Sequence, residues 1–416
     1  MKKILVRGPA LSQSGYGEQT RFILRSLRSQ AERFDIFLLN LNWGSTGFII
    51  EDCEEREWID FLLAKTIRYT QSGGQMDISI QVTIPQEWEN LAPINIGATA
   101  GTETTKISPL WLEKSMMMDK IIVISEHTKY AFDNTTYTAT QDGRDFSAKV
   151  NCPVEVVGYP VKSVAPESLD LDLKYDFNFL TVGTWIARKN LPNTIKWFVE
   201  EFYEQEVGLI VKTSMAKNSL RDREFTQLKL KSILDEYKGR KCEVYLLHGD
   251  LTDSQMAGLY REEKIKALVS LSHGEGYGLP LFEAAYSGLP VVAPAWGGQL
   301  DFLCMPMKKK GGQLKKQAAF CDIAYDIKPI QPEAVWENVL IKDSLWCYPK
   351  EWNYKKSLRL LKKDYGAAKS QAKKLQKWIL EEFEESKMYE KMADIVYKPS
   401  KEEEEWNSTL SEIQML

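Results

Sequence analysis

One segment carries the most information about this chain: it runs from Ser272 to Pro290 and reads SHGEGYGLPLFEAAYSGLP. An apolar run at residues 267–271 precedes it and is typical of a buried strand. Pro280 suits the first turn of a helix, and Gly288 followed by Pro290 ends that helix after about two turns. A strand, a glycine-rich loop and a helix in this order indicate one unit of an α/β fold.

The loop of this segment has the chemistry of a phosphate site. Its glycines at 274, 276 and 278 lack Cβ atoms, so we expect the backbone to approach a ligand closely. The unpaired N–H groups and partial positive charge of a helix N-terminus favour phosphate oxygens by about 0.3–1 kcal/mol. Glu275 and Glu283 can accept hydrogen bonds from sugar hydroxyls at opposite ends of one elongated ligand. A capped loop with two solvent-facing glutamates is the alternative, and the combined pattern makes it the weaker interpretation.

Short apolar runs alternate with helical patterns along the chain. They lie at residues 4–6, 36–39, 78–82, 94–98, 121–124 and 154–157, and again at 177–182, 208–211, 244–247, 267–271 and 290–293. Strands that alternate with helices favour parallel pairing. The two sets are separated by Gly158–Pro166, a segment with two prolines and little periodicity, which is typical of a domain junction.

We therefore predict two domains, because 416 residues exceed the roughly 150 of a single domain. Residues 1–165 form the first domain and residues 166–380 the second, each an α/β domain with a doubly wound parallel sheet. A single long helix with an apolar face is expected from Ala367 to Ile395. Residues 381–416 comprise the end of this helix and an acidic tail, which we interpret as a solvated chain end.

Composition limits the classes of function. The chain has 54 Lys and Arg against 58 Asp and Glu, a net charge of −4, so no global field favours nucleic acid or an anionic membrane. The six cysteines form no C-x-x-C pair and no histidine stands at zinc spacing, so neither a disulfide framework nor a bound metal is indicated. Because no secretory apolar core and no run of about 18 apolar residues occurs, we expect a cytoplasmic protein.

Two charged stretches allow other interpretations. Asp170-Leu171-Asp172 has the form of a metal-binding D-x-D, but it does not follow a buried strand, and we interpret it as solvated charge. The basic stretch Lys308–Gly312, continued by Lys315 and Lys316, is expected to be a loop. Peripheral contact with a membrane surface through this basic stretch stays open.

Segment 272–290 resembles the E-x7-E signature of retaining, nucleotide-sugar-dependent glycosyltransferases of family 4. The similarity continues through Gly288–Ala293 to Trp296-Gly297-Gly298. The resemblance implies the GT-B fold, in which two Rossmann-like domains face a central cleft and the last helix crosses back to the first domain. It also implies that Glu283 binds the ribose hydroxyls and that Glu275 binds the transferred sugar near the reacting carbon. The backbone that would hold the diphosphate and the sugar belongs to Gly276, Tyr277, Gly278 and Leu279.

A second segment, TVGTWIARKNL at residues 181–191, resembles the family's glycine followed by a basic pair. The resemblance implies that Lys189 contacts the donor diphosphate and makes Arg188 a further catalytic candidate. The family often has arginine directly after the glycine, where this chain has Thr184. Lys212 is the best substitute cation, because polar residues at the end of a parallel strand face the ligand crevice. An exposed basic pair at a helix start and a surface lysine are the respective alternatives.

The first domain supplies the remaining candidates. Gly15-Tyr16-Gly17 resembles the family's glycine-rich loop after the first strand, which faces the donor's phosphates and sugar. Glu103 is a candidate for contact with the acceptor or the sugar, and Trp43 for the acceptor site, although a capping carboxylate and a buried tryptophan fit equally well. Of the histidines, His127 is interpreted as a surface helix residue, and His273 as either a site residue or packing support for the loop.

These residues predict an enzyme that moves a sugar from a nucleotide-diphosphate sugar to an acceptor hydroxyl. The resemblance implies retention of anomeric configuration without a metal ion, and no cofactor besides the donor as co-substrate. Neither UDP nor GDP is favoured, the acceptor is a glycan, a lipid or a protein, and the oligomeric state is not indicated.

Two alternatives stay open. A nucleotide-sugar epimerase is disfavoured because the chain is poor in histidine and such an enzyme needs acid and base groups around the sugar. A catalytically silent nucleotide-sugar-binding protein is disfavoured because Glu275, Glu283 and Lys189 are all present.

Overall fold

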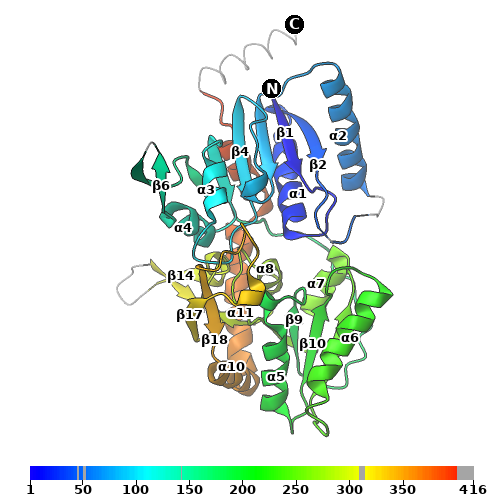
Figure 1. The fold of residues 1–416 in the computed structure, drawn as a ribbon. Coiled ribbons are helices and arrows are strands. Elements are labelled where there is room, and N and C mark those ends of the chain that lie inside the picture. Colours follow the sequence, from blue (N-terminus) through cyan, green and yellow to red (C-terminus); the bar gives the residue numbers. More distant parts are fainter. Residues whose placement is uncertain (45, 50–52, 142, 309–313, 401–416) are drawn as a thin grey trace.

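The computed structural model describes residues 1–44, 46–49, 53–141, 143–308 and 314–400. Two six-stranded parallel sheets form the centres of two stacked lobes (Figure 1). The first sheet has the order β2-β1-β3-β4-β5-β8, with β1 Lys2–Gly8, β2 Phe34–Asn40, β3 Ile78–Val82, β4 Ile94–Thr99, β5 Lys120–Val123 and β8 Val154–Val156. The second has the order β11-β10-β9-β12-β13-β16, with β9 Asn178–Val182, β10 Gly208–Thr213, β11 Glu243–His248, β12 Ile265–Val269, β13 Val291–Pro294 and β16 Cys321–Ile323.

Each apolar run predicted as a strand overlaps a strand of these two sheets. The prediction of parallel pairing is confirmed for both sheets. Only β16 among their strands was missed, since three residues are too few to show a period. The segment predicted as the domain junction, Gly158–Pro166, contains no helix or strand. The three domain ranges stay predictions.

Helices cover the faces of both sheets. Around the first sheet lie α1 Gly15–Arg28, α2 Glu54–Gln71, η1 Pro85–Glu87, α3 Pro109–Ser115 and α4 Glu126–Asn134. Around the second lie η2 Ala187–Lys189, α5 Leu191–Phe202, α6 Leu220–Leu234, α7 Asp253–Arg261, α8 Leu279–Tyr286 and α9 Leu300–Leu303. The eight residues of α8 match the short helix expected between Pro280 and Gly288.

The two domains share part of one apolar core. Strands β3 and β13 are buried along their whole length, as expected for sheets with helices on both faces. One continuous cluster of buried residues joins the first sheet to the second domain. At the junction the rings of Tyr159 and Tyr277 lie edge to face with centroids 5.0 Å apart, and Phe282 packs on Phe383 at 5.4 Å. The packing therefore continues from one lobe into the other.

The C-terminal helices are α10 Glu351–Lys363, α11 Tyr365–Glu382 and α12 Glu385–Val396. The prediction of one helix from Ala367 to Ile395 is wrong, because the chain breaks at Phe383 and Glu384. The Phe383 carbonyl accepts a hydrogen bond from the Val161 amide at 2.8 Å, and the Glu384 carboxylate caps α12 by accepting one from the Lys387 amide. These contacts turn the chain at the point where it leaves the second domain.

Helix α12 lies against α1, so the predicted crossing back to the first domain is confirmed (Figure 1). Met388 and Met392 on α12 are buried, and Phe22 of α1 packs on Tyr389 with ring centroids 6.0 Å apart. Asp394 adds an ion pair with Arg33 at 2.9 Å. The end of α12 is therefore part of the core of the first domain.

Three antiparallel hairpins were not predicted. They are β6 Tyr137–Gln141 with β7 Arg144–Ala148, β14 Cys304–Lys308 with β15 Leu314–Ala318, and β17 Tyr325–Pro329 with β18 Leu345–Pro349, which encloses η3 Pro332–Ala334. The prediction of a basic loop is therefore wrong for Lys308, which ends β14, and for Lys315 and Lys316, which lie on β15. Their exposed strand lacks the apolar alternation that signals a strand in sequence. Residues 309–312 of that stretch lie outside the described residues, as does the acidic tail.

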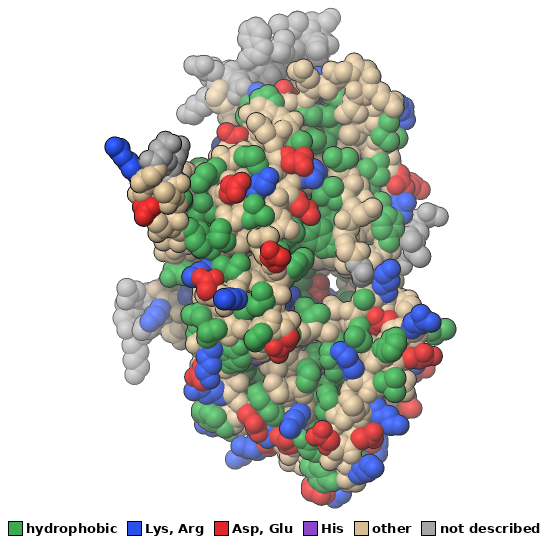
Figure 2. All heavy atoms as spheres, in the orientation of Figure 1, with side chains coloured by type: hydrophobic (Ala, Val, Ile, Leu, Met, Phe, Trp, Pro, Cys, Tyr) green, Lys and Arg blue, Asp and Glu red, His purple; other side chains and the backbone are tan. Residues whose placement is uncertain are grey.

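The surface agrees with the small net charge. On the face seen in Figure 2, acidic and basic side chains are interspersed. Asp170 and Asp172 are exposed, as expected for solvated charge. Within the described ranges, none of the helices combines the length and the apolar character that a membrane span requires.

The packing of α12 on the first domain can be tested by shortening one of its buried side chains. Met392 is 1% exposed, so Met392→Ala should lower the free energy of unfolding by about 2–4 kcal/mol through lost burial and a cavity. Leu380 of α11 is 44% exposed, so Leu380→Ala should change this free energy by less than about 0.5 kcal/mol. Urea unfolding followed by circular dichroism measures both. Equal stability of the two variants would mean that α12 does not belong to the core.

Candidate active site

A cavity of about 310 Å³ lies between the two domains. Loops at the carboxyl ends of β1 and β4 reach it from the first domain, and the loops before α5 and α8 reach it from the second. Ligands of parallel α/β sheets bind at this end of the strands. The predicted site residues that line the cavity are Gly15, Tyr16, Trp43, Glu103, Arg188, Lys189, Glu275, Gly276, Tyr277, Gly278 and Leu279.

Two cations and two carboxylates form one ion cluster at the wall of this cavity. Lys189 Nζ lies 2.6 Å from Glu275 Oε1, and Arg188 Nη1 lies 3.2 Å from Glu275 Oε2. The other guanidinium nitrogen, Nη2, lies 3.3 Å from Glu103 Oε1, which belongs to the first domain. The predicted candidates of both domains are therefore brought together. Their formal charges cancel within the cluster.

Burial and neighbouring opposite charges shift the pKa values of this cluster in opposite directions. Burial alone would raise the pKa of Glu275, but the charges of Lys189 and Arg188 outweigh it and lower the pKa to about 2. For Lys189, burial outweighs the attraction of Glu275 and lowers the pKa of the ammonium below its ordinary value. Glu275 is thus an anion throughout the physiological range, held by two nearly buried cations.

Backbone contacts fix the two loops that carry these charges. Asn190 adopts the left-handed conformation (φ 53°) between η2 and α5, and its side-chain amide donates to the Leu271 carbonyl at 3.2 Å. Arg188 donates to the Gly274 carbonyl at 2.8 Å, and its own carbonyl accepts from the His273 amide at 2.8 Å. Because the loops are bonded to each other, the positions of Lys189 and Glu275 are set together.

The glycines of the loop before α8 serve the contact between domains. A Cβ atom on Gly274 would lie 2.0 Å from the Glu103 carbonyl oxygen, and one on Gly276 would lie 2.6 Å from that of Ala100. Ser125 also donates to the Gly276 carbonyl at 2.7 Å. We expected these glycines to let the backbone approach a ligand. Their nearest neighbours in the structure are instead backbone atoms of the first domain.

Glu283 lies on α8 but does not line the cavity. Its carboxylate accepts a hydrogen bond from the Tyr260 hydroxyl at 2.9 Å. Burial is the largest influence on it and, despite the nearby charge of Lys162, raises its pKa to about 7. The residue predicted to bind the ribose hydroxyls is therefore a half-buried carboxyl group that is bonded to Tyr260 in this structure.

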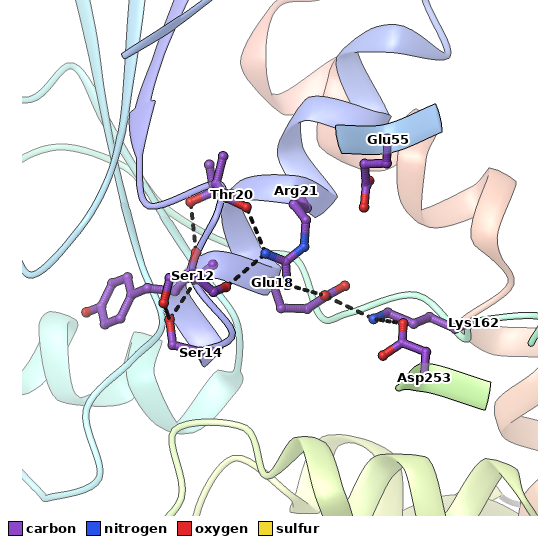
Figure 3. Close-up of polar contacts among 12 residues, drawn as sticks. Ser12, Ser14, Glu18, Thr20, Arg21, Glu55, Lys162 and Asp253 are labelled. Carbon is purple, nitrogen blue, oxygen red and sulfur yellow. Dashed lines mark hydrogen bonds and ion pairs between the residues drawn. The ribbon is translucent and has the colours of Figure 1, made fainter. Parts of the chain in front are cut away.

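Lys162 joins the two domains beside Glu283. Its ammonium lies 3.0 Å from Glu18 of α1 and 3.0 Å from Asp253 of α7 (Figure 3). Glu18 also pairs with Arg21 at 3.1 Å and with Arg25 at 3.2 Å. A lysine of the interdomain segment thus bridges one acidic side chain of each domain.

The loop after β1 places an aromatic pair in the cavity. Ser14 caps α1 by accepting a hydrogen bond from the Gly17 amide at 3.1 Å. The Tyr16 hydroxyl lies 2.7 Å from that of Thr99, and the Tyr16 ring packs on Trp43 with centroids 4.3 Å apart. Gly17 itself does not line the cavity, because it faces the Ser12 carbonyl.

Two further predicted residues do not line the cavity. Lys212, at the end of β10, donates to the Gly249 carbonyl, and burial lowers the pKa of its ammonium. Thr184 is exposed. Arg188, rather than Lys212, is therefore the second cation beside Lys189.

No group of three or more His, Cys, Asp or Glu side chains within the described ranges is arranged to hold a metal ion.

Sequence reasoning missed part of the cavity wall. Trp336 and Val339, from the segment between β17 and β18, line it together with Trp111 of α3. Trp336 and Val339 lie in a segment without strand or helix periodicity, so no sequence signal pointed to them.

The structure places both candidate histidines outside the cavity lining. His273 is 3% exposed, and its Nδ1 lies 2.7 Å from the Cys347 carbonyl, so it supports the loop by packing. His127 is partly buried against Trp296 with ring centroids 4.8 Å apart, and burial lowers its pKa to about 4. The prediction that His127 is a surface residue is wrong, because α4 faces the second domain at this point.

The opposite pKa shifts of the two glutamates predict opposite effects on stability. The pKa of Glu275 is lowered from 4.5 to about 2, so its stabilising contribution is present above pH 4.5 and is lost as the pH falls through 2. Glu275→Gln should therefore lower the free energy of unfolding by about 3 kcal/mol at pH 7, and this difference from the wild type should shrink below pH 4.

Glu283→Gln should have the reverse effect. The pKa of Glu283 is raised from 4.5 to about 7, so its favourable contribution is present below pH 4.5 and is lost as the pH rises through 7. The free energy of unfolding of the variant should exceed that of the wild type by about 1–3 kcal/mol at pH 8 and should equal it at pH 4.5. Urea unfolding across this pH range measures both variants. Destabilisation by Glu283→Gln at pH 8 would contradict the raised pKa of the Glu283 carboxyl group.

Solved structures of several glycosyltransferases share this architecture. A glycosyltransferase from Rickettsia africae is 14% identical, with a TM-score of 0.59 over 96% of this chain and 99% of that one. HepE from Anabaena, solved with UDP and glucose, is 13% identical, with a TM-score of 0.59 over 95% and 99%. Sucrose-phosphate synthase from Thermosynechococcus elongatus is 13% identical, with a TM-score of 0.58 over 95% and 98%.

No protein-family model matches the sequence, and no curated protein matches it either. At these identities the structural similarity concerns the fold. The two parallel Rossmann-like sheets, the cavity between them and the crossing of α12 establish that the chain has the GT-B fold.

Proposed function

We propose that this protein is a glycosyltransferase that moves a sugar from a nucleotide-diphosphate sugar to an acceptor hydroxyl. The observation that carries the proposal is the convergence of Arg188, Lys189 and Glu275 beside the N-terminus of α8, in a cavity between the two domains. The E-x7-E resemblance supports it, and so does the fold shared with HepE, which was solved with UDP and glucose.

The leaving diphosphate sets the electrostatic requirement of this reaction. Charge grows on its oxygens as the bond to the sugar breaks, and fixed cations and backbone N–H groups stabilise that charge. Lys189 and Arg188 supply the cations. Gly278, in the left-handed conformation (φ 94°), precedes α8. Pro280 has no N–H, and the Leu281 amide donates to the Gly278 carbonyl at 2.9 Å, so the first turn offers the Leu279 amide to a phosphate oxygen.

Donor binding requires these cations to exchange partners, because Glu103 and Glu275 neutralise them in the structure. Glu103 belongs to the first domain and Arg188 to the second, so opening of the domains separates this pair. Arg188 then faces the donor phosphates. Closing around the bound donor excludes water from the reacting carbon and limits hydrolysis.

Glu275 then accepts a hydrogen bond from a hydroxyl of the transferred sugar. The assignment of Glu283 to the ribose requires its carboxylate to exchange the Tyr260 hydroxyl for a ribose hydroxyl. We propose that the acceptor hydroxyl attacks from the face that the diphosphate leaves, so that the anomeric configuration is retained. The departing phosphate oxygen takes the proton of the acceptor, and no metal ion takes part.

We assign the enzyme to family 4 on its motifs, and place it in the cytoplasm with peripheral membrane contact left open.

A panel of UDP- and GDP-sugars separates this proposal from its alternatives. Transfer or slow hydrolysis supports the glycosyltransferase, an isomerised sugar supports an epimerase, and binding without turnover supports a silent binding protein. In the same assay, the anomeric proton coupling of the product reports retention, and EDTA reports metal dependence. An inverted product or loss of activity in EDTA would contradict the corresponding part of the mechanism.

Lys189→Ala should weaken donor use. Loss of a charged hydrogen bond to the diphosphate corresponds to about 1.5–3 kcal/mol, so kcat/KM for the donor should fall by roughly 10- to 150-fold. Lys196→Ala removes an exposed lysine of α5 nearby in sequence and should leave kcat/KM unchanged. Unaltered donor kinetics in Lys189→Ala would transfer the role to Arg188.

Glu103→Gln should tighten the binding of free UDP or GDP. The variant removes a carboxylate that competes with phosphate for Arg188, and we expect the Kd to fall about three- to tenfold. Isothermal titration with the nucleotide alone isolates this effect from any contact between Glu103 and a sugar. A weaker nucleotide Kd in the variant would contradict the competition.

A further inference from the structure

The segment between β17 and β18 belongs to the second domain but is bonded to the first. Lys106 pairs with Asp343 at 2.5 Å, and the Ser108 hydroxyl donates to the Asn338 carbonyl at 2.8 Å. The Thr105 amide also donates to the Leu345 carbonyl at 3.0 Å. We call residues 330–345 the bridging segment, because it spans the domain junction at the edge of the cavity.

The bridging segment is also anchored to the loop that precedes α8. His273 is stacked on Trp346 with ring centroids 5.0 Å apart, and its Nε2 lies 3.1 Å from the Gln331 side chain. The Cys347 amide donates to the His273 carbonyl at 2.9 Å, and η3 packs against η2, which carries Arg188 and Lys189. The position of the bridging segment is therefore fixed relative to the ion cluster.

Six aromatic side chains line the cavity, four of them apart from the Tyr159–Tyr277 pair. Trp336 comes from the bridging segment, and Tyr16, Trp43 and Trp111 come from the first domain. Trp336 is 55% exposed although it lines the cavity, so its ring is accessible to a ligand. Trp111 is only 1% exposed, and its indole N–H has no hydrogen-bond partner among the described residues. A buried N–H of this kind carries a desolvation penalty that a ligand oxygen would remove.

This combination matches a sugar ring. One face of a pyranose presents C–H groups that pack on an aromatic ring, while its rim presents hydroxyl oxygens that accept hydrogen bonds. A prenyl chain would cover the aromatic rings but would leave the Trp111 N–H without an acceptor. A hydroxyl of a peptide side chain would bring no ring to pack on Trp336.

We propose that the bridging segment and the facing aromatic residues form an acceptor subsite for a sugar residue, so that the acceptor is a glycan. Trp336 determines acceptor specificity by packing on the ring, and Trp111 donates to one of its oxygens. This inference rests on the proposed glycosyl transfer and specifies its acceptor class.

The test uses the full-length protein and the nucleotide sugar that proves active in the panel. Cellobiose, maltotriose and chitotriose represent sugar acceptors, farnesyl phosphate represents a lipid, and a Ser/Thr-rich peptide represents a protein acceptor. Transfer of a radiolabelled sugar is measured for each. Hydrolysis of the donor without an acceptor is measured separately, because it depends on the donor site alone.

We expect transfer to at least one oligosaccharide. Trp336→Ala should raise the acceptor KM about tenfold and leave donor hydrolysis within twofold of the wild type, and Trp336→Phe should restore most of the affinity. Trp111→Phe, which removes the N–H but keeps an aromatic ring, should raise the acceptor KM by a similar factor. Trp352→Ala is the matched control, since Trp352 is 59% exposed on α10 and does not line the cavity.

Two results would overturn the inference while the proposed function stands. One is an unchanged acceptor KM in Trp336→Ala, and the other is transfer only to farnesyl phosphate or the peptide. Absence of both transfer and donor hydrolysis across the whole panel would instead contradict the proposed function.

Discussion

The compensation of charge around Glu275 is the constraint on which the site depends. A carboxylate with 8% side-chain exposure survives as an anion because Lys189 and Arg188 lie within 3.2 Å. Removing water from these three groups is costly, and their mutual attraction offsets that cost only in one arrangement. The hydrogen bonds between the loops at 188–190 and 271–274 hold this arrangement. The local backbone is therefore organised around the charges.

The same constraint couples the site to the arrangement of the domains. Glu103 completes the ion cluster from the first domain, and glycines 274 and 276 leave room for its backbone and that of Ala100. On the other side of the junction, Lys162 holds Glu18 and Asp253 together. A donor that replaces the carboxylates around Arg188 would remove one of these links. Ligand binding and domain closure would then depend on the same charged groups.

Much of the fold could be predicted from the sequence, because strand and helix periodicities are local properties. The strands, the short helix α8 and the placement of Glu275 and Lys189 follow from such patterns. The break at Phe383 depends on a contact with Val161, and the close approach at Gly276 depends on Ala100. Trp336 reaches the cavity through an irregular segment. These features arise from contacts between distant residues, which one sequence does not reveal.

A crystal structure with an intact or hydrolysed nucleotide sugar tests the central claim most directly, because it shows which oxygens the buried cations hold. We predict that Lys189 and Arg188 contact oxygens of the diphosphate and that Glu275 has moved from the Lys189 ammonium to a sugar hydroxyl. A nucleotide bound elsewhere, with the ion pairs of Glu275 to Lys189 and Arg188 unchanged, would contradict it.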